Sequence, residues 1–471
     1  MKHPRTLIAL SSMILIGAAP PPSSPDAKLR AMIAPVSGAR MKATVEALVG
    51  FGTRHTLSSQ SDPKRGIGAA LGWSKGQFES FGLPTERPCD TFTGARIPTP
   101  TRVCDMVAIQ RGTERPNDVV IITGHIDSRV TDILNADALE PGANDDGSGS
   151  ATVMEAARVL SRHKFAGTIV YALLSGEEQG LYGGKVLAAY AKAQGWNVVA
   201  NLNNDIVGNS CSSDGVCDAT HVRVFSEGPR WQGHEQLAAQ WRSLGGENDS
   251  PSRNISRWLD GLADRLKIGL DVRQVWRNDR FGRGGDHTEF LNAGYPAVRF
   301  SVAIENYDWQ HQDVRVENGK HYGDTVDHMN FAYLEKVAKL NIAALAALAS
   351  APPPPEVTVE GAVSTDTSVS WRPVAGARGY AVRWRRTDAA NWEHSRPANP
   401  DSVTPAATPS DSGGPNAPTR AVGHSVVLKG IRVDDWVFGV SSVSKDGFES
   451  PVASAVPGGA FQPWVAAAES K

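Results

Sequence analysis

The chain has 471 residues, of which 41% are apolar, enough for a large core and for more than one domain. Its 48 lysine and arginine residues nearly balance its 50 aspartate and glutamate residues. This balance gives no electrostatic reason to expect binding to nucleic acid or to an anionic membrane surface.

The first residues have the layout of a secretory signal peptide. A basic start at Met1–Arg5 precedes a mostly apolar stretch over Thr6–Gly17, and small residues lead to the prolines Pro20–Pro22. The apolar stretch is short for a bilayer span, which argues against the alternative of an N-terminal membrane anchor. We therefore predict that residues 1–19 are a signal peptide and that the mature protein is secreted or periplasmic, without a membrane span.

Between residues 26 and 350, strand-like and helix-like segments alternate. Strands are predicted at Asp105–Ile109, Val119–Thr123, Ile169–Leu174, Val198–Leu202, His221–Phe225 and Pro296–Ser301. Helices are predicted at Gly66–Glu79, Ser148–His163, Gly180–Gln194, Ser252–Leu266 and Phe331–Ala349. This alternation predicts an α/β domain, with a mostly parallel sheet sandwiched by helices, over residues 26–350.

The character of the chain changes after the prolines Pro352–Pro355, which end the last predicted helix. We interpret residues 351–356 as a Pro-rich linker. Beyond it, period-two alternation without helical patterns predicts a small all-β sandwich over residues 357–465. Parts of this region, including Tyr380–Trp384, resemble a fibronectin type III domain, which could bind a surface or a polymer. The segment Asn391–Thr419 is rich in Pro, Ser and Asn and is predicted to be a mobile loop.

The chain has four cysteines, and export would favour their pairing as disulfides. Three pairings are possible. We favour Cys89–Cys104 and Cys211–Cys217, because each closes a local loop rich in Gly, Ser, Thr or Pro. A cysteine zinc site is the alternative, but the sequence contains no C-x-x-C pair.

Acidic side chains and a histidine follow the predicted strands at the points where the strands end. These groups are His125 with Asp127, Asp145 with Asp146, Glu177 with Glu178, and Asp205. Groups beyond the carboxyl ends of parallel strands converge on one crevice of the sheet. Because crowded carboxylates repel one another unless a cation neutralises them, the sequence predicts a pair of divalent metal ions.

The residue types suit zinc, which binds histidine nitrogen and carboxylate oxygen. His125 would bind one ion, and Asp127 would hold the other nitrogen of its ring. Asp145 would bridge two ions, which together ionise a shared water. One of the adjacent Glu177 and Glu178 would bind metal, and the other would stay free as the general base.

Three segments carry a family resemblance. Thr123–Asp127, Gly142–Gly149 and Ser175–Gly180 resemble the di-zinc (co-catalytic) aminopeptidases, a family that includes bacterial leucyl aminopeptidase and glutamate carboxypeptidase. Asn204–Gly208 and Gly285–His287 also fit, so that the resemblance covers roughly residues 30–350.

The resemblance implies a zinc exopeptidase-like fold and two zinc ions per chain. The implied metal ligands are His125, Asp145, Glu178, Asp205 and His311. It also implies that Glu177 is the general base, that Asp127 orients His125 and that the Asp145–Asp146 peptide bond is cis. Asp286, His287 and Tyr322 are the expected substrate-binding residues, although His287 could instead pack structurally.

The last histidine ligand is where the sequence departs from the family. Relatives show Tyr-His followed shortly by Asp-Thr, whereas here a longer stretch separates His311 from Asp324. We favour His311 as the ligand and keep His321 as the alternative. The tyrosine that usually stabilises the tetrahedral intermediate has no clear counterpart, and Tyr322 and Tyr307 are the candidates.

The leading functional hypothesis is an exported aminopeptidase that acts on peptides, with its two zinc ions holding the free amine and the scissile carbonyl. A carboxypeptidase or another amide hydrolase of the same fold is the first rival hypothesis, with Arg280, Arg283 or Arg299 as the cation for a substrate carboxylate. A glutaminyl-cyclase-like transferase with one zinc ion is the second rival, and a non-catalytic binding protein is the third.

Overall fold

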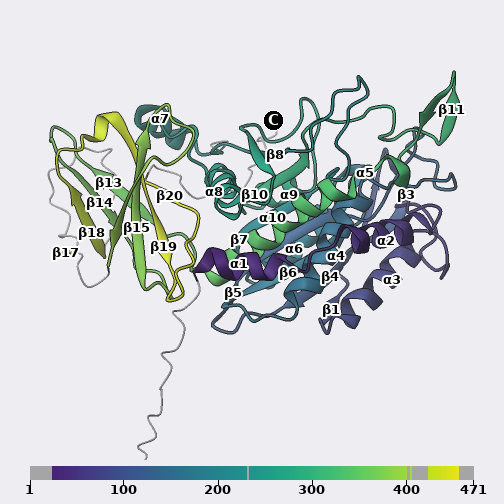
Figure 1. Ribbon diagram of the computed structural model, residues 1–471, viewed down its shortest axis with the longest axis horizontal. Coiled ribbons are helices and arrows are strands. Elements are labelled where there is room, and N and C mark those ends of the chain that lie inside the picture. The colour runs from purple at the N-terminus through teal and green to yellow at the C-terminus, as the bar shows by residue number, and fades with distance from the viewer. Residues whose placement is uncertain (1–23, 231–232, 400–403, 406–422, 456–471) are drawn as a thin grey trace, which may run out of the picture.

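The structure is a computed structural model that describes residues 24–230, 233–399, 404–405 and 423–455. The predicted signal peptide, residues 1–19, lies outside these residues, and so does the predicted sandwich beyond residue 455. Figure 1 shows two parts side by side: a sheet covered by helices, and a smaller part made of strands.

The larger part is built on an eight-stranded sheet. In spatial order its strands are β1 (Thr85–Glu86), β4 (Met106–Gln110), β6 (Gly167–Leu174), β5 (Arg115–His125), β7 (Asn197–Asn204), β10 (Ala297–Val302), β8 (His221–Ser226) and β9 (Asp271–Val275). The central run β6–β5–β7–β10 is parallel. β4 pairs antiparallel with β6, and β8 pairs antiparallel with β10. At the edges, β1 pairs antiparallel with β4, and β9 pairs parallel with β8. The predicted mostly parallel sheet with helices on both faces is confirmed.

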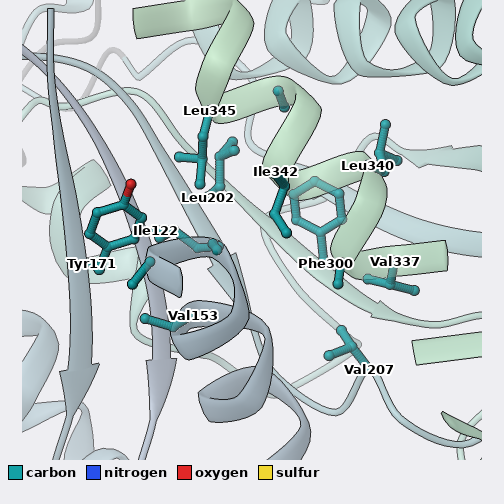
Figure 2. Packing of buried hydrophobic residues seen from close by; sticks show 14 of the residues in the cluster. Ile122, Val153, Tyr171, Leu202, Val207, Phe300, Val337, Leu340, Ile342 and Leu345 are labelled. Atoms are coloured by element: carbon teal, nitrogen blue, oxygen red, sulfur yellow. The ribbon is translucent and has the colours of Figure 1, made fainter. Parts of the chain in front are cut away.

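Strand β5 shows why the central strands are continuously apolar. Val120 and Ile122 point into the core on one face of the sheet, and Val119 and Ile121 into the core on the other face. Both faces are covered at this point, which explains why the stretch 119–122 is apolar at every position. Figure 2 shows the first face, where α10 and α4 pack side chains against strand residues such as Phe300.

Ten α-helices surround the sheet. They are α1 (Pro25–Ile33), α2 (Gly38–Val49), α3 (Ile67–Ser80), α4 (Gly147–Leu160), α5 (Glu177–Gly180), α6 (Tyr182–Ala193), α7 (Glu235–Leu244), α8 (Pro251–Leu266), α9 (His287–Asn292) and α10 (Phe331–Ser350), all within the described residues. Capping side chains mark the starts of three of them: Asp146 accepts from an N–H of α4, Ser250 caps α8, and Asn330 caps α10. In the described part of the chain, no helix combines the length and the apolar character needed to cross a bilayer.

Two hairpins and two disulfides complete this part. The hairpins are β2 (Cys89–Gly94) with β3 (Ile97–Cys104) and β11 (Arg315–Glu317) with β12 (Lys320–Tyr322), and a short 3-10 helix, Val326–His328, follows the second. The disulfides are Cys89–Cys104 and Cys211–Cys217, as predicted. The first joins residues that lie directly opposite each other in the β2–β3 hairpin.

The smaller part consists of two four-stranded antiparallel sheets. One contains β13 (Val357–Glu360), β14 (Thr367–Trp371), β18 (His424–Leu428) and β17 (Thr404–Pro405), and the other contains β16 (His394–Ala398), β15 (Gly379–Arg386), β19 (Trp436–Val443) and β20 (Ala453–Ser454). Side chains from both sheets, including Trp371 and Val440, share one buried cluster. The resemblance to a fibronectin type III domain stays a prediction.

One prediction in this part is wrong. β16 lies inside the segment Asn391–Thr419, which the composition favoured as a loop. It pairs with β15 from Tyr380 opposite Ala398 to Trp384 opposite His394. Pairing with a neighbouring strand outweighs the weak intrinsic preference of such residues. Most of the segment after residue 399 lies outside the described residues.

The two parts are joined by buried contacts. Arg385 of β15 and Asp249, just before α8, form an ion pair at 2.7 Å, with side chains that are 1% and 0% exposed. Asn254 of α8 donates to the hydroxyl of Ser454 at 2.9 Å. Phe448 of the smaller part belongs to the main core of the larger one. The smaller part is therefore packed against the larger one as part of the same body.

Candidate metal centre

The parallel strands bring the predicted site residues to one edge of the sheet. β5 ends at His125, β6 ends shortly before Glu177 and Glu178, and β7 ends just before Asp205. Because β6, β5 and β7 are neighbours and run parallel, their carboxyl ends lie together. Asp145 joins them from the loop that precedes α4.

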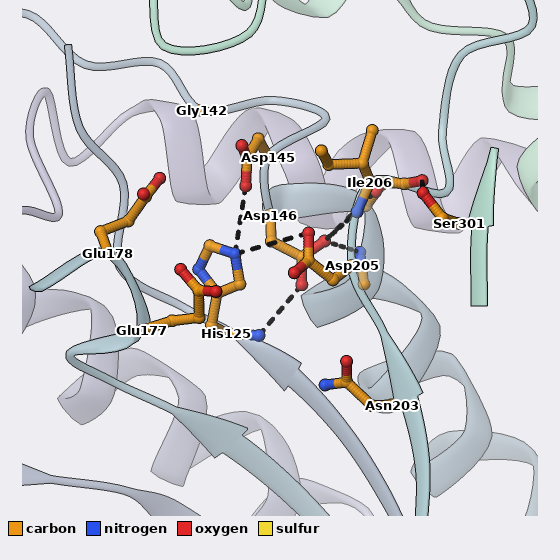
Figure 3. A network of polar contacts seen from close by, with 12 residues as sticks. His125, Gly142, Asp145, Asp146, Glu177, Glu178, Asn203, Asp205, Ile206 and Ser301 are labelled. Atoms are coloured by element: carbon orange, nitrogen blue, oxygen red, sulfur yellow. Dashed lines mark hydrogen bonds and ion pairs between the residues drawn. The ribbon is translucent and has the colours of Figure 1, made fainter. Parts of the chain in front are cut away.

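The side chains form two groups that share one residue. In the first, His125 Nε2 lies 3.1 Å from Asp145 Oδ1 and 3.9 Å from Asp205 Oδ1 (Figure 3). In the second, His311 Nε2 lies 2.9 Å from Asp145 Oδ2 and 3.1 Å from Glu178 Oε1. Asp145 thus offers one oxygen to each group. Of the two candidate histidines, His311 is the one at the cluster, whereas His321 is exposed on β12.

The donor atoms fit a metal ion. Within each group, the three possible ligand atoms lie within 4.8 Å of one another. Imidazole nitrogen and carboxylate oxygen are donors that zinc accepts. Glu178 Oε1 is buried and, although it is close to His311, has no hydrogen bond with acceptable geometry. A buried carboxylate oxygen without a partner is costly, and a cation between it and His311 would remove that cost.

Asp127 contacts the ring of His125. His125 Nδ1 lies 3.0 Å from the backbone oxygen of Asp127 and 3.5 Å from its carboxylate. The carboxylate also accepts from the hydroxyl of Thr56 at 3.0 Å and from the backbone N–H of Glu178 at 3.2 Å. Asp127 thus fixes both the imidazole and the turn that carries the two glutamates.

Glu177 belongs to neither group of candidate ligands. Its carboxylate lies near the His125 ring in Figure 3. Burial raises the pKa of Glu177 well above its usual range, and the charges of Asp205, Glu178 and Asp286 raise this pKa further. A free carboxylate with a raised pKa beside metal ligands is suited to accept a proton from bound water.

In each group, an arginine also forms an ion pair with one of the carboxylates. Arg299, which is 0% exposed, places Nη2 2.9 Å from Asp205 Oδ1. Arg129 donates from Nε to Glu178 Oε2 at 2.9 Å, and its Nη2 lies 2.5 Å from His311 Nδ1. Burial alone would raise the pKa of Asp205, but Arg299 and His125 lower it below its usual value. The sequence did not single out Arg129, because only the fold brings it to Glu178.

The arginines weighed as partners for a substrate carboxylate are all engaged inside the protein. Arg299 also binds Asp279 at 2.8 Å. Arg280 contacts Asp279 at 2.9 Å and Glu305 at 3.3 Å, and Arg283 contacts Glu305 at 2.9 Å. Each of these three cations already has a carboxylate partner.

Two further aspartates hold the loop of Asp145 in place. Asp146 accepts from the backbone N–H of His125 at 3.0 Å and of Ile206 at 3.2 Å. Asp324 accepts from the backbone N–H of Asp145 at 2.7 Å, and burial raises its pKa to about 7. The Asp145–Asp146 peptide bond is cis, as the family resemblance implied. The supporting role of Asp324 was not predicted, because it depends on contacts between distant segments.

Two of the predicted substrate-binding residues, Asp286 and His287, are buried. Asp286 is buried and accepts from the backbone N–H of Gly184 at 3.1 Å, and burial raises its pKa to about 8. His287 is 0% exposed, and its ring contacts the backbone oxygen of Asn278 at 2.9 Å. Within the described residues, no hydrogen bond or ion pair joins His287 to a candidate metal ligand. Its role in the substrate pocket stays a prediction.

The two candidate tyrosines lie away from the cluster contacts. Tyr322 lies in the β11–β12 hairpin, with the guanidinium of Arg315 4.1 Å from its ring centre, and Tyr307 is 63% exposed. The side chain that does reach the cluster is Gln310, whose Nε2 donates to Asp145 Oδ2 at 3.1 Å. Sequence reasoning missed Gln310, although it stands immediately before His311, where relatives show a tyrosine.

Comparisons with known proteins agree with this arrangement. A sequence profile of peptidase family M28 matches residues 105–345. A protein of Pyrenophora tritici-repentis named "Probable zinc metalloprotease" is 40% identical over 450 residues, which cover 93% of this chain and 88% of that protein. One from Pyricularia oryzae with the same name is 40% identical over 467 residues, with the same two coverages. The solved structure of the Legionella pneumophila LapA aminopeptidase has a similar fold, with a TM-score of 0.50 and 20% identity over 74% of this chain and 80% of that one.

Proposed function

Because the chain belongs to peptidase family M28, we propose that it is an exported zinc aminopeptidase that removes N-terminal residues from peptides through a two-metal centre. Relatives that are 40% identical along most of this chain are named as zinc metalloproteases, which supports zinc as the metal. The predicted signal peptide and the two disulfides support export.

The observation that carries the proposal is the shared position of Asp145. One of its oxygens faces His125 and Asp205, and the other faces His311 and Glu178. A carboxylate placed in this way would bridge two ions, each with its own histidine and its own second carboxylate. When bound, two zinc ions would supply a water that is ionised at neutral pH and would polarise the scissile carbonyl.

The chain's own residues would then handle the proton and the substrate. Glu177, which is free of both ligand groups, takes a proton from the attacking water and passes it to the leaving amine. The amide of Gln310, held beside Asp145, is a candidate donor to the oxygen that becomes negative during attack. Arg129 and Arg299 keep the carboxylates of Glu178 and Asp205 in place.

The engaged arginines favour an aminopeptidase over a carboxypeptidase. A carboxypeptidase needs a cation for the terminal carboxylate of its substrate. Arg280, Arg283 and Arg299 already bind Asp279, Glu305 or Asp205, so a substrate carboxylate would have to compete with these carboxylates for each arginine.

Three matched substrates test the proposal. The zinc-loaded enzyme is expected to release p-nitroaniline from leucyl-p-nitroanilide and to cleave a peptide whose carboxyl end is amidated. It should act poorly on an N-acetylated form of the same peptide that has a free carboxyl end. Cleavage of this acetylated peptide without cleavage of the amidated one would indicate a carboxypeptidase. No hydrolysis of any of the three would favour a binding protein or a different amide hydrolase.

A further inference from the structure

A small polar pocket lies directly beside the shared Asp145. Its volume is about 10 Å³, and its wall includes Asn144, Asn209, Asn306 and Gln310. A space of this size holds roughly one water-sized group. The pocket adjoins the cluster, and none of these three asparagines is a candidate metal ligand.

Asn209, one of the wall residues, carries a side-chain oxygen that no hydrogen bond uses. Its side chain is 1% exposed, and Nδ2 donates to the backbone oxygen of Cys211 at 3.2 Å. Since a carbonyl oxygen can only accept, this contact fixes which end of the amide carries the nitrogen. Asn209 Oδ1 is consequently left buried without any hydrogen-bond partner. A buried acceptor of this kind is costly unless a ligand or a water donates to it.

Two other amides of the wall already have hydrogen-bond partners. Asn306 also donates to the backbone oxygen of Cys211, at 3.3 Å, and its Oδ1 already accepts from the N–H of Asp308 at 3.1 Å. Gln310 Nε2 is engaged with Asp145. The carboxylates of Asp145 and Asp324 border the same pocket. Carboxylate oxygens accept hydrogen bonds, which favours a group that donates them.

We propose that this pocket receives the free amino group of the substrate and that Asn209 Oδ1 accepts one of its N–H groups. The inference rests on the proposed aminopeptidase function. In a peptide, the terminal nitrogen lies about 2.5 Å from the carbonyl carbon of the same residue. A substrate whose first carbonyl is held at the cluster therefore places its amine next to Asp145. An acylated nitrogen is too large for this space, so the pocket would also exclude N-blocked peptides.

The test compares leucyl-p-nitroanilide with 4-methylpentanoyl-p-nitroanilide, which lacks only the amine. For the wild-type protein, kcat/KM is expected to be at least about 100-fold higher for the amine-bearing substrate. Asn209→Ala should lower kcat/KM for that substrate by about 10- to 100-fold, the effect of one hydrogen bond to a charged group, and leave the other substrate nearly unaffected. Asn209→Asp, which keeps an acceptor, should preserve the ratio of the two substrates.

Asn254→Ala is the control. It removes a buried asparagine that hydrogen-bonds Ser454 and does not line this pocket, so any effect should be equal for both substrates. If Asn209→Ala slows both substrates equally, Asn209 is only structural and the inference is overturned. If the wild-type protein does not distinguish the two substrates, the proposed aminopeptidase function itself fails. If the wild-type protein prefers the amine-bearing substrate and Asn209→Ala keeps the same preference, the inference is overturned but the proposed aminopeptidase function stands.

A second measurement does not use the asparagine variants. A crystal structure of the zinc-loaded Glu177→Gln protein with leucinamide should place the ligand nitrogen within hydrogen-bond distance of Asn209 Oδ1. A water in the pocket with the amine bound elsewhere would overturn the inference.

Discussion

Replacement of the buried Arg299 by methionine should make the stability of the protein depend more strongly on zinc. The guanidinium lies 2.9 Å from Asp205 Oδ1 and 2.8 Å from Asp279 Oδ2, and the Arg299 side chain is 0% exposed. At an effective dielectric constant of about 20, the attraction to Asp205 alone is about 6 kcal/mol before the cost of desolvation. Breaking such a buried pair typically lowers the free energy of unfolding by about 3–5 kcal/mol.

Zinc should recover part of this loss, because an ion bound between His125 and Asp205 supplies the missing positive charge. Without Arg299 competing for Asp205, that ion should also bind more tightly. We expect the metal-free Arg299→Met protein to melt roughly 5–10 °C below the metal-free wild type. Zinc should then raise its melting temperature by more than it raises that of the wild type.

Thermal unfolding with chelator and with excess zinc measures both effects. Arg223→Met is the matched control: Arg223 binds Glu305 at 2.6 Å and has no contact with the candidate metal ligands of the described chain. It should lower the melting temperature without changing the response to zinc. The reasoning is refuted if Arg299→Met and Arg223→Met respond identically to zinc, or if the metal-free Arg299→Met protein is as stable as the wild type.

Three further predictions concern the shared ligand, the general base and the junction of the two parts. Asp145→Ala should lose both zinc ions and His311→Ala only one, as measured by metal analysis of purified protein, and two ions retained in Asp145→Ala would disprove the bridging role. Glu177→Gln should keep both ions while kcat falls by about 10²- to 10⁴-fold, so that near-normal turnover would remove Glu177 from the mechanism. Arg385→Ala leaves the buried Asp249 unpaired and should lower the free energy of unfolding by about 3–5 kcal/mol without changing kcat well below the melting temperature. An unchanged denaturation midpoint would show that this ion pair does not fasten the two parts.

The sequence predicted the elements that carry the site because their signals are local. The apolar run Val119–Thr123 falls within β5, and the predicted helix Phe331–Ala349 is one residue shorter than α10. Capping residues such as Asn330 mark helix starts in the sequence itself. The direction of each strand is not a local property, so the antiparallel placement of β8 beside β10 came only from the structure.

The candidate ligands could be predicted for a related reason, since all but His311 lie at the end of a strand or close to the start of a helix. The supporting residues could not. Arg129 meets His311 across 182 residues of chain, and Asp324 meets Asp145 across 179. Asn209 stands out only when its surroundings are known, because an unused acceptor is defined by the partners that it lacks.

The most direct test of the two-metal centre is anomalous scattering at the zinc edge from crystals grown with zinc. Two peaks of similar height are expected about 3.5–4 Å apart, one beside each oxygen of Asp145. One should lie between His125 and Asp205, and the other between His311 and Glu178. A single peak, or peaks that do not share Asp145, would contradict the account.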